Sequence, residues 1–185
     1  DVVKGLQYLH ENRIVHGDIK PENVLVGADS VCKLTDFGSA VEKIAEKQEN
    51  ANHDVFDIRG TAPYMAPEVA RGDQPSKPSD VWSFGILLHE LVTGRLPWEH
   101  EPSAAKSQVR LMQGLAKPLG TEGVLRPQIM SALLQQGADS AEEGTSTKPA
   151  DADIGVAVSL IKACLQEDPF DRPSAKDLLH HHFLL

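Results

Sequence analysis

The feature that most constrains the fold is a stretch of residues, 80–92, that is apolar on almost every side of a helix. Its apolar members are Val81, Trp82, Phe84, Ile86, Leu87, Leu88, Leu91 and Val92. A helix at the surface keeps one polar face, whereas a helix that is apolar all round is buried. The sequence therefore predicts a helix in the centre of the domain. Gly94 fits the end of this helix, because glycine readily adopts the left-handed conformation found there.

The composition is that of one soluble globular domain. The chain has 185 residues, of which 41% are hydrophobic and 24% charged, and its net charge is −9. The negative charge argues against nucleic acid or an anionic membrane as the partner. No apolar run approaches the roughly 20 residues needed to cross a bilayer. These features predict a cytoplasmic protein. Cys32 and Cys164 are expected to be buried reduced thiols, and a disulfide between them is the alternative. The sequence does not determine the oligomeric state.

A short β-hairpin is predicted near the start of the chain. Residues 24–26 and 31–34 are rich in branched apolar side chains and flank the turn Gly-Ala-Asp-Ser. Asn23 precedes the first strand and Asp36 follows the second. Antiparallel pairing brings these two positions side by side at the open end of the hairpin. Two oxygen ligands placed there can share a cation.

The rest of the chain divides into helices and polar segments. We expect helices at 1–11, 103–120 and 156–165, a polar surface loop at 39–59, a flexible insertion at about 137–153, and a last short helix opened by a Ser-x-x-Asp capping box at 174–177. The chain starts with neither an initiator Met nor a signal-peptide pattern, so we expect it to begin inside a larger protein.

Four polar residues in the first third of the chain suit phosphoryl transfer. Asp18 offers a base for a hydroxyl, Lys20 a cation for a phosphate, and Asn23 and Asp36 oxygen ligands for magnesium. A polar surface turn also contains Asp and Asn. The strand pair that separates Asn23 from the sequence Asp-Phe-Gly at 36–38 favours the site over the turn.

The motifs resemble the catalytic half of the protein kinase family. They are His-Gly-Asp-Ile-Lys-Pro-Glu-Asn at 16–23, Asp-Phe-Gly at 36–38 and Ala-Pro-Glu at 66–68. The resemblance implies that Asp18 orients the substrate hydroxyl and accepts its proton. It implies that Lys20 contacts the transferring phosphate, and that Thr61 hydrogen-bonds both Asp18 and Lys20. The placement of Lys20 is that of the serine/threonine branch.

The resemblance also implies a nucleotide and metal site. Lys20, Asn23, Leu25 and Asp36 are expected to bind ATP, with Leu25 as the floor under the adenine ring. Asn23 and Asp36 are expected to hold Mg²⁺, which prefers oxygen ligands. A branched apolar residue in a strand such as Leu25 is also compatible with an ordinary core position.

Five further residues are implied to support the site rather than react. Glu68 and Arg172 are expected to form a buried bidentate ion pair, since two unpaired surface charges fit the motifs around them less well. Asp80 is expected to bind the backbone of the loop at 16–18. His16 and Phe37 are expected to stack, and both to be buried.

The resemblance implies a mainly α-helical fold with a small β-hairpin, the large (C-terminal) lobe of a protein kinase. The glycine-rich loop, strand lysine and glutamate of the small lobe have no match in this chain. The implied activity is ATP-dependent phosphorylation of protein serine or threonine, with an isolated chain inactive. A pseudokinase or scaffold and a truncated non-catalytic fragment are the alternatives. Within the family, the loop at 60–68 and the chain end resemble the mitogen-activated kinase kinase kinase group, so the protein substrate is a candidate downstream kinase.

One departure from the family pattern concerns regulation. Gly17 stands where many kinases have an arginine that receives a phosphate on the activation loop. Independently, no Ser, Thr or Tyr lies between Val41 and Gly60. Receiver and donor are therefore missing together, so we expect activity that does not depend on phosphorylation of this loop.

Overall fold

The computed structural model describes residues 1–42, 60–97 and 151–184, and, of residues 151–154, the backbone only. In chain order its elements are α1 (Val2–Glu11), β1 (Ile14–Val15), η1 (Pro21–Asn23), β2 (Val24–Val26), β3 (Cys32–Leu34), η2 (Phe37–Ser39), β4 (Val41–Glu42), η3 (Ala62–Tyr64), α2 (Pro67–Ala70), α3 (Lys77–Thr93), α6 (Asp151–Cys164), η4 (Pro169–Asp171), α7 (Ala175–Leu178) and η5 (His182–Leu184). The η elements are short 3₁₀ turns. The described chain is thus mostly helical, with two small antiparallel strand pairs.

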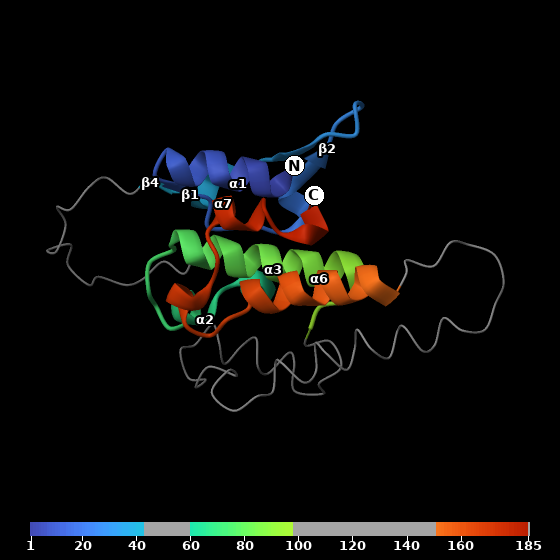
Figure 1. The fold of residues 1–185 in the computed structure, drawn as a ribbon. Coiled ribbons are helices and arrows are strands. Elements are labelled where there is room, and N and C mark those ends of the chain that lie inside the picture. The colour runs from blue at the N-terminus through green and yellow to red at the C-terminus, as the bar shows by residue number, and fades with distance from the viewer. Residues whose placement is uncertain (43–59, 98–150, 185) are drawn as a thin grey trace, which may run out of the picture.

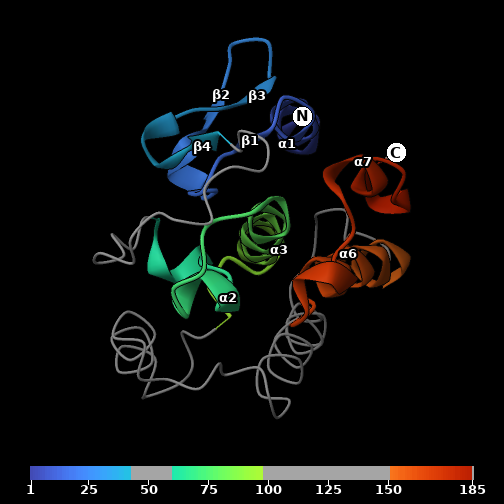
Figure 2. The same cartoon turned by 90° about the vertical axis from the view of Figure 1, so that its left-hand side faces the viewer.

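The central helix predicted from the apolar run is α3. A reciprocal capping box between Ser76 and Ser79 opens it, and Gly94 ends it with a φ of 70°. Figure 2 shows α3 in the middle, with α1, α2 and α6 around it. The prediction that this helix is buried on all sides is wrong for Leu91 and Val92, which are 70% and 37% exposed. They lie in the last turn, where the helix end leaves the core on one side while Thr93 stays buried on the other.

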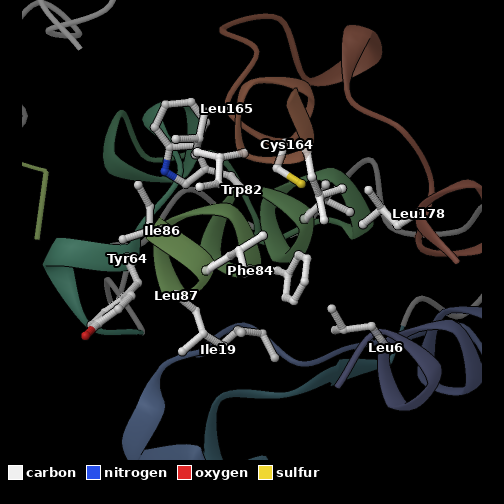
Figure 3. Packing of buried hydrophobic residues seen from close by; sticks show 14 of the residues in the cluster. Leu6, Ile19, Tyr64, Trp82, Phe84, Ile86, Leu87, Cys164, Leu165 and Leu178 are labelled. Atoms are coloured by element: carbon white, nitrogen blue, oxygen red, sulfur yellow. The ribbon is translucent and has the colours of Figure 1, made fainter. Parts of the chain in front are cut away.

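The core is built around α3. Helix α6 packs along α3, and α7 packs against α1 (Figure 1). Figure 3 shows α3 side chains meeting Leu6 and Ile19 on one side and Cys164 and Leu165 on the other. Gly85 permits the close approach of α6, because a Cβ there would lie 2.7 Å from the Cβ of Cys164. Burial raises the pKa of the Cys164 thiol to about 12, so this sulfur is a core group.

The predicted hairpin is present, with an additional strand pair beside it. Strands β2 and β3 are antiparallel with Leu25 opposite Lys33, close to the predicted bounds. Both cysteines are free thiols, but only Cys164 is fully buried. The prediction of a loop from residue 39 is wrong at its start, because η2 ends at Ser39 and β4 pairs with β1, Val41 opposite Val15. A strand of two residues, such as β4, is too short to show an alternating pattern in the sequence. It is recognised only by its pairing with β1, which lies far away in the chain.

Several predicted segments lie outside the described residues. They are the rest of the loop at 43–59, the helix at 103–120 and the insertion at 137–150. The helix predicted at 156–165 is α6, which begins five residues earlier and therefore includes 151–153, assigned above to the insertion. No helix in the described ranges is long and apolar enough to cross a membrane.

A buried ion pair joins α2 to the segment before α7, as predicted. The guanidinium of Arg172 donates to both carboxylate oxygens of Glu68, at 2.6 and 2.8 Å. Its other donors reach the carbonyls of Gln166, Pro78 and Glu167. The same group lies 5.0 Å from the ring centroid of Trp82. A buried pair with all its donors satisfied fixes geometry, and removal of either partner leaves an uncompensated buried charge.

We expect Arg172→Ala to lower the free energy of unfolding by about 3–5 kcal/mol, because Glu68 would remain buried without its partner. Lys176→Ala is the matched control, since it removes an exposed cation four residues away and should change stability by less than about 0.5 kcal/mol. Denaturant unfolding of the protein that carries this chain measures both. A loss for Arg172→Ala below about 1 kcal/mol, typical of a surface pair, would contradict the prediction.

Candidate functional site

One buried carboxylate on α3 binds the loop that carries Asp18. Asp80, in the first turn of α3, is 1% exposed and accepts hydrogen bonds from the backbone N–H groups of His16 and Gly17, both at 2.9 Å. The predicted contact between Asp80 and the loop is thus present. His10, near the end of α1, adds a third contact, with Nε2 2.9 Å from Asp80 Oδ2. The loop, α1 and α3 therefore meet at one side chain.

Asp18, Lys20 and Thr61 form one connected network. Lys20 Nζ lies 2.7 Å from Asp18 Oδ2 and 2.6 Å from the hydroxyl of Thr61. The backbone N–H of Thr61 donates to Asp18 Oδ1 at 2.8 Å. Both contacts predicted for Thr61 are present, one through its side chain and one through its backbone. Residues separated by about forty positions in sequence thus fix the orientation of the carboxylate.

Asn23 closes the network on the side of the hairpin. It is buried at the end of η1, and its side-chain nitrogen donates to the carbonyl of Asp18 at 2.8 Å and to Asp18 Oδ2 at 3.2 Å. The nitrogen is therefore turned toward Asp18, which leaves the amide oxygen as the atom that can face a cation. This oxygen suits Mg²⁺, which takes only a few protein oxygens and completes its shell with phosphate and water.

Asp36 lies one residue beyond Thr35, the residue that pairs with Asn23 across the hairpin, so the hairpin brings Asp36 close to Asn23 as predicted. The N–H of Thr35 donates to the carbonyl of Asn23 at 2.9 Å, so the two strand ends adjoin. Asp36 has a left-handed backbone, φ 59° and ψ 78°, and its Oδ1 accepts the N–H of Gly38 at 3.2 Å. One carboxylate oxygen thus caps its own turn, and the other is left for an external ligand. The donor set of one amide and one carboxylate oxygen fits a magnesium ion that also binds phosphate.

The charges around Asp18 keep its carboxylate ionised. Burial raises the pKa of Asp18, but the hydrogen bonds from Lys20 and Thr61 and the positive charge of Lys20 outweigh it. The net pKa of Asp18 lies below its ordinary value. A carboxylate in this state accepts hydrogen bonds at neutral pH and does not donate them.

Phe37 is more exposed than predicted. His16 is fully buried and its ring centroid lies 5.2 Å from that of Phe37, but the two ring planes are tilted by 50°, so the rings are in contact and not stacked in parallel. Phe37 itself is 50% exposed, which corrects the expectation that both rings are buried. Leu25 is 57% exposed, so the alternative of an ordinary core position is wrong for this residue.

Sequence reasoning missed His10. Its position on the buried face of α1, after Val3, Leu6 and Leu9, gives the pattern of an ordinary amphipathic helix. A buried histidine needs a polar partner in the core. The histidine on the apolar face of α1 was therefore the one sequence feature that could have indicated a contact with a residue such as Asp80. Within the described ranges, no cluster of three or more His, Cys, Asp or Glu side chains forms a candidate metal site.

One carboxylate, one lysine and the polar side chains at the open end of the hairpin thus lie close together. The chain belongs to the protein kinase family: the family model described as "Protein kinase domain" matches residues 1–184. Members of this family use ATP and Mg²⁺. Within the family, the chain resembles the mitogen-activated protein kinase kinase kinase group of serine/threonine kinases.

Individual relatives include both mitogen-activated protein kinase kinases and kinase kinase kinases. The chain is 36% identical over 190 residues to mitogen-activated protein kinase kinase 1 of Arabidopsis thaliana, covering 99% of the chain and 44% of that protein. It is 31% identical over 186 residues to mitogen-activated protein kinase kinase kinase 17 of the same plant, covering 100% of the chain and 41% of the relative. It is 32% identical over 185 residues to MAP kinase kinase kinase mkh1 of Schizosaccharomyces pombe, covering 99% and 14%. The chain spans less than half the length of each.

We expect Lys20→Met to raise the pKa of Asp18, because the substitution removes both a hydrogen bond and a positive charge while burial remains. A titration of the Asp18 carboxyl carbon by NMR measures this in the protein that carries the chain. Lys33→Met is the control, since Lys33 is an exposed cation on β3. The wild-type midpoint should lie below about 3.9, the ordinary value for Asp. A midpoint that Lys20→Met leaves unchanged would contradict this account of the site.

Proposed function

We propose that this chain is the large-lobe part of a protein serine/threonine kinase that transfers the γ-phosphate of ATP to a protein hydroxyl. The observation that carries the proposal is the network of Asp18, Lys20, Thr61 and Asn23. It orients one ionised carboxylate by contacts from its own loop, through Lys20 and Asn23, and from the distant segment that carries Thr61. Such positioning is the main contribution a protein can make to phosphoryl transfer, because little covalent chemistry falls to its side chains.

In the proposed reaction Asp18 accepts a hydrogen bond from the substrate hydroxyl and takes its proton as the new bond forms. The hydroxyl oxygen bonds to the γ-phosphorus, the bond from that phosphorus to the bridging oxygen breaks, and ADP leaves. Lys20 neutralises charge on the transferring phosphate while it stays within reach of Asp18. Asn23 and Asp36 would hold Mg²⁺, which when bound offsets the negative charge of the phosphates.

The lobe assignment is part of the proposal. It is supported by the mainly helical content of the described chain and by the apolar side chains exposed at the hairpin side of the site. Leu25 and Phe37 are half or more exposed there. Large apolar side chains beside a polar site are suited to contact an adenine ring or another apolar surface. We assign Leu25 to the floor under the adenine and Phe37 to the junction with a small lobe.

A protein segment is the proposed acceptor. A small hollow beside Asp18 is lined both by polar residues, among them Thr61 and Ser79, and by apolar ones, among them Met65 and Pro75. The proposed acceptor is a protein segment whose hydroxyl residue reaches Asp18. The names of the relatives, kinases that act on kinases, support a downstream kinase as the substrate.

We expect Asp18→Ala to lower kcat by about 10² to 10⁴, the usual contribution of a positioned proton acceptor. Asp29→Ala is the matched control, because Asp29 is an exposed carboxylate at the turn end of the same hairpin. The assay is ATP-dependent phosphorylation of a protein substrate by the full protein that carries this chain. Turnover within about twofold of wild type for Asp18→Ala would remove this residue from its proposed role.

The same assay separates the kinase from a pseudokinase. A catalytic protein should bind ATP with Mg²⁺ and transfer phosphate. Asp36→Ala should abolish the phosphate transfer and also the dependence of ATP binding on Mg²⁺. A wild-type protein that binds nucleotide and transfers no phosphate to any protein or to itself would support a scaffold and reject the proposed activity.

A further inference from the structure

The last turn of the described chain, η5, is capped by a histidine. His181 directly precedes this turn, and its carbonyl accepts the N–H of Leu184 at 2.8 Å. Its side chain acts at the same place, because Nδ1 accepts the N–H of Phe183 at 3.3 Å. The first N–H groups of a helical turn usually bind an oxygen of Ser, Thr, Asp or Asn. An imidazole in this role differs from those caps, because it gains a charge between about pH 5 and 8.

The other ring nitrogen of His181 reaches a different helix. Its Nε2 lies 3.0 Å from the hydroxyl oxygen of Ser159 on α6, the helix that packs against η5. Figure 1 shows α6 and the C-terminal end of the chain. One partly buried imidazole therefore makes two contacts in opposite directions. With one nitrogen it caps η5, and with the other it is bound to α6.

The two contacts together require a neutral ring in one tautomer. A backbone N–H can only donate, so Nδ1 must carry no proton when it accepts from Phe183. The single proton of the neutral ring is then on Nε2, which donates to Ser159 Oγ. This tautomer is assigned from the hydrogen-bond partners. A second proton would bind at Nδ1, where it would face the N–H of Phe183 and remove the cap.

We propose that His181 is a pH-sensitive cap, which keeps η5 closed while its ring is neutral and lets the turn open when the ring takes a second proton. Ser159 is part of this switch. A free histidine side chain would turn its charged ring toward solvent, whereas the bond from Nε2 to Ser159 is kept on protonation and holds Nδ1 against the N–H of Phe183. Neither contact involves the phosphoryl-transfer residues, so the cap is independent of the proposed kinase function.

The charged groups near His181 give its second proton little support. On the elements that pack against it and next to it, the described ionisable side chains are Lys162 and the core thiol Cys164 on α6, Lys176 and Asp177 on α7, and the neighbouring His180 and His182. Asp177 is the one carboxylate in this set, and its Oδ2 accepts from the hydroxyl and the N–H of Ser174, at 2.6 and 3.1 Å. Among the described residues, no carboxylate pairs with the ring of His181.

Opening of η5 changes the surface at this end of the domain. The turn contains Phe183 and Leu184, which are each 36% exposed while it is closed. Loss of the cap leaves the N–H of Phe183 to bind water and exposes more of both side chains. Mildly acidic conditions therefore add apolar surface beside α6, and neutral conditions remove it.

Three consecutive histidines make a matched experiment possible. His181→Asn keeps a cap that does not titrate, because an Asn oxygen can accept the N–H two residues on. His181→Phe keeps a ring and removes the cap. His180→Gln and His182→Gln are the controls, since each removes an exposed histidine and leaves both contacts of His181 in place. The measurement is solvent exchange of the Phe183 amide by NMR, corrected for the intrinsic effect of pH, in the protein that carries this chain, labelled with ¹⁵N-phenylalanine.

We expect protection of the Phe183 amide in the wild type to fall about fivefold between about pH 7.5 and 5.5, the usual effect of a lost cap. The two control variants should show the same fall. His181→Asn should stay protected at both pH values, and His181→Phe should be unprotected at both. Protection that does not change with pH in the wild type, or a fall that persists in His181→Asn, would overturn the proposal.

The ring of His181 provides a second measurement. At about pH 7.5 its ¹⁵N chemical shifts should place the proton on Nε2, and a proton on Nδ1 would overturn the assignment on which the cap depends. Ser159→Ala should reduce the pH response of the Phe183 amide by about half or more, because the ring is then free to turn away. An undiminished response would overturn the role of Ser159. Both measurements are independent of phosphate transfer, so they decide the cap whether or not the proposed kinase function holds.

Discussion

The site depends on one buried carboxylate. Asp80 is almost without solvent contact, and a charge in that position is tolerated only when its oxygens are fully hydrogen-bonded. His10 and the backbone of His16 and Gly17 meet that requirement. The need is mutual, because two backbone N–H groups in a loop outside regular structure also lack other partners. Satisfying the charge therefore fixes the loop on α3, the central helix among the residues that the structure describes.

A series of short contacts that begins at Asp80 fixes the positions of the site residues. Gly17 is fixed by Asp80, Gly60 packs on the carbonyl of Gly17, and Thr61 then reaches Asp18. The chain that follows Thr61 is held in turn by the ion pair of Glu68 with Arg172. The loop containing Asp18 and the segment from Gly60 to Glu68 are thus attached to the core at separate points.

The sequence predicted the parts of the structure that local chemistry determines. The capping box at Ser174, the all-apolar helix and the hairpin ends each follow from residues within a few positions. The pairing of β4 with β1 was not predicted, because it joins residues more than twenty positions apart and is too short to show alternation. The exposure of Phe37 was also missed, since an aromatic residue beside a buried histidine is normally core. For the site, family motifs indicated Asp18, Thr61 and Asp80, whereas the contributions of His10 and Gly60 became visible only as distances.

The state of Asp18 reflects the same balance between burial and partners. Burial alone would favour a protonated carboxyl, which could not accept a proton from a substrate. The contacts from Lys20 and Thr61 reverse that preference and lower its pKa. A carboxylate with a lowered pKa is a weak base in isolation, so its value in the proposed reaction lies in orientation. It holds a hydroxyl in line with the phosphate and takes the proton only once bond formation has made that hydroxyl acidic. A site that works by orientation requires a fixed backbone around it, and here Asp80 binds the N–H groups of His16 and Gly17 while the N–H of Thr61 binds Asp18.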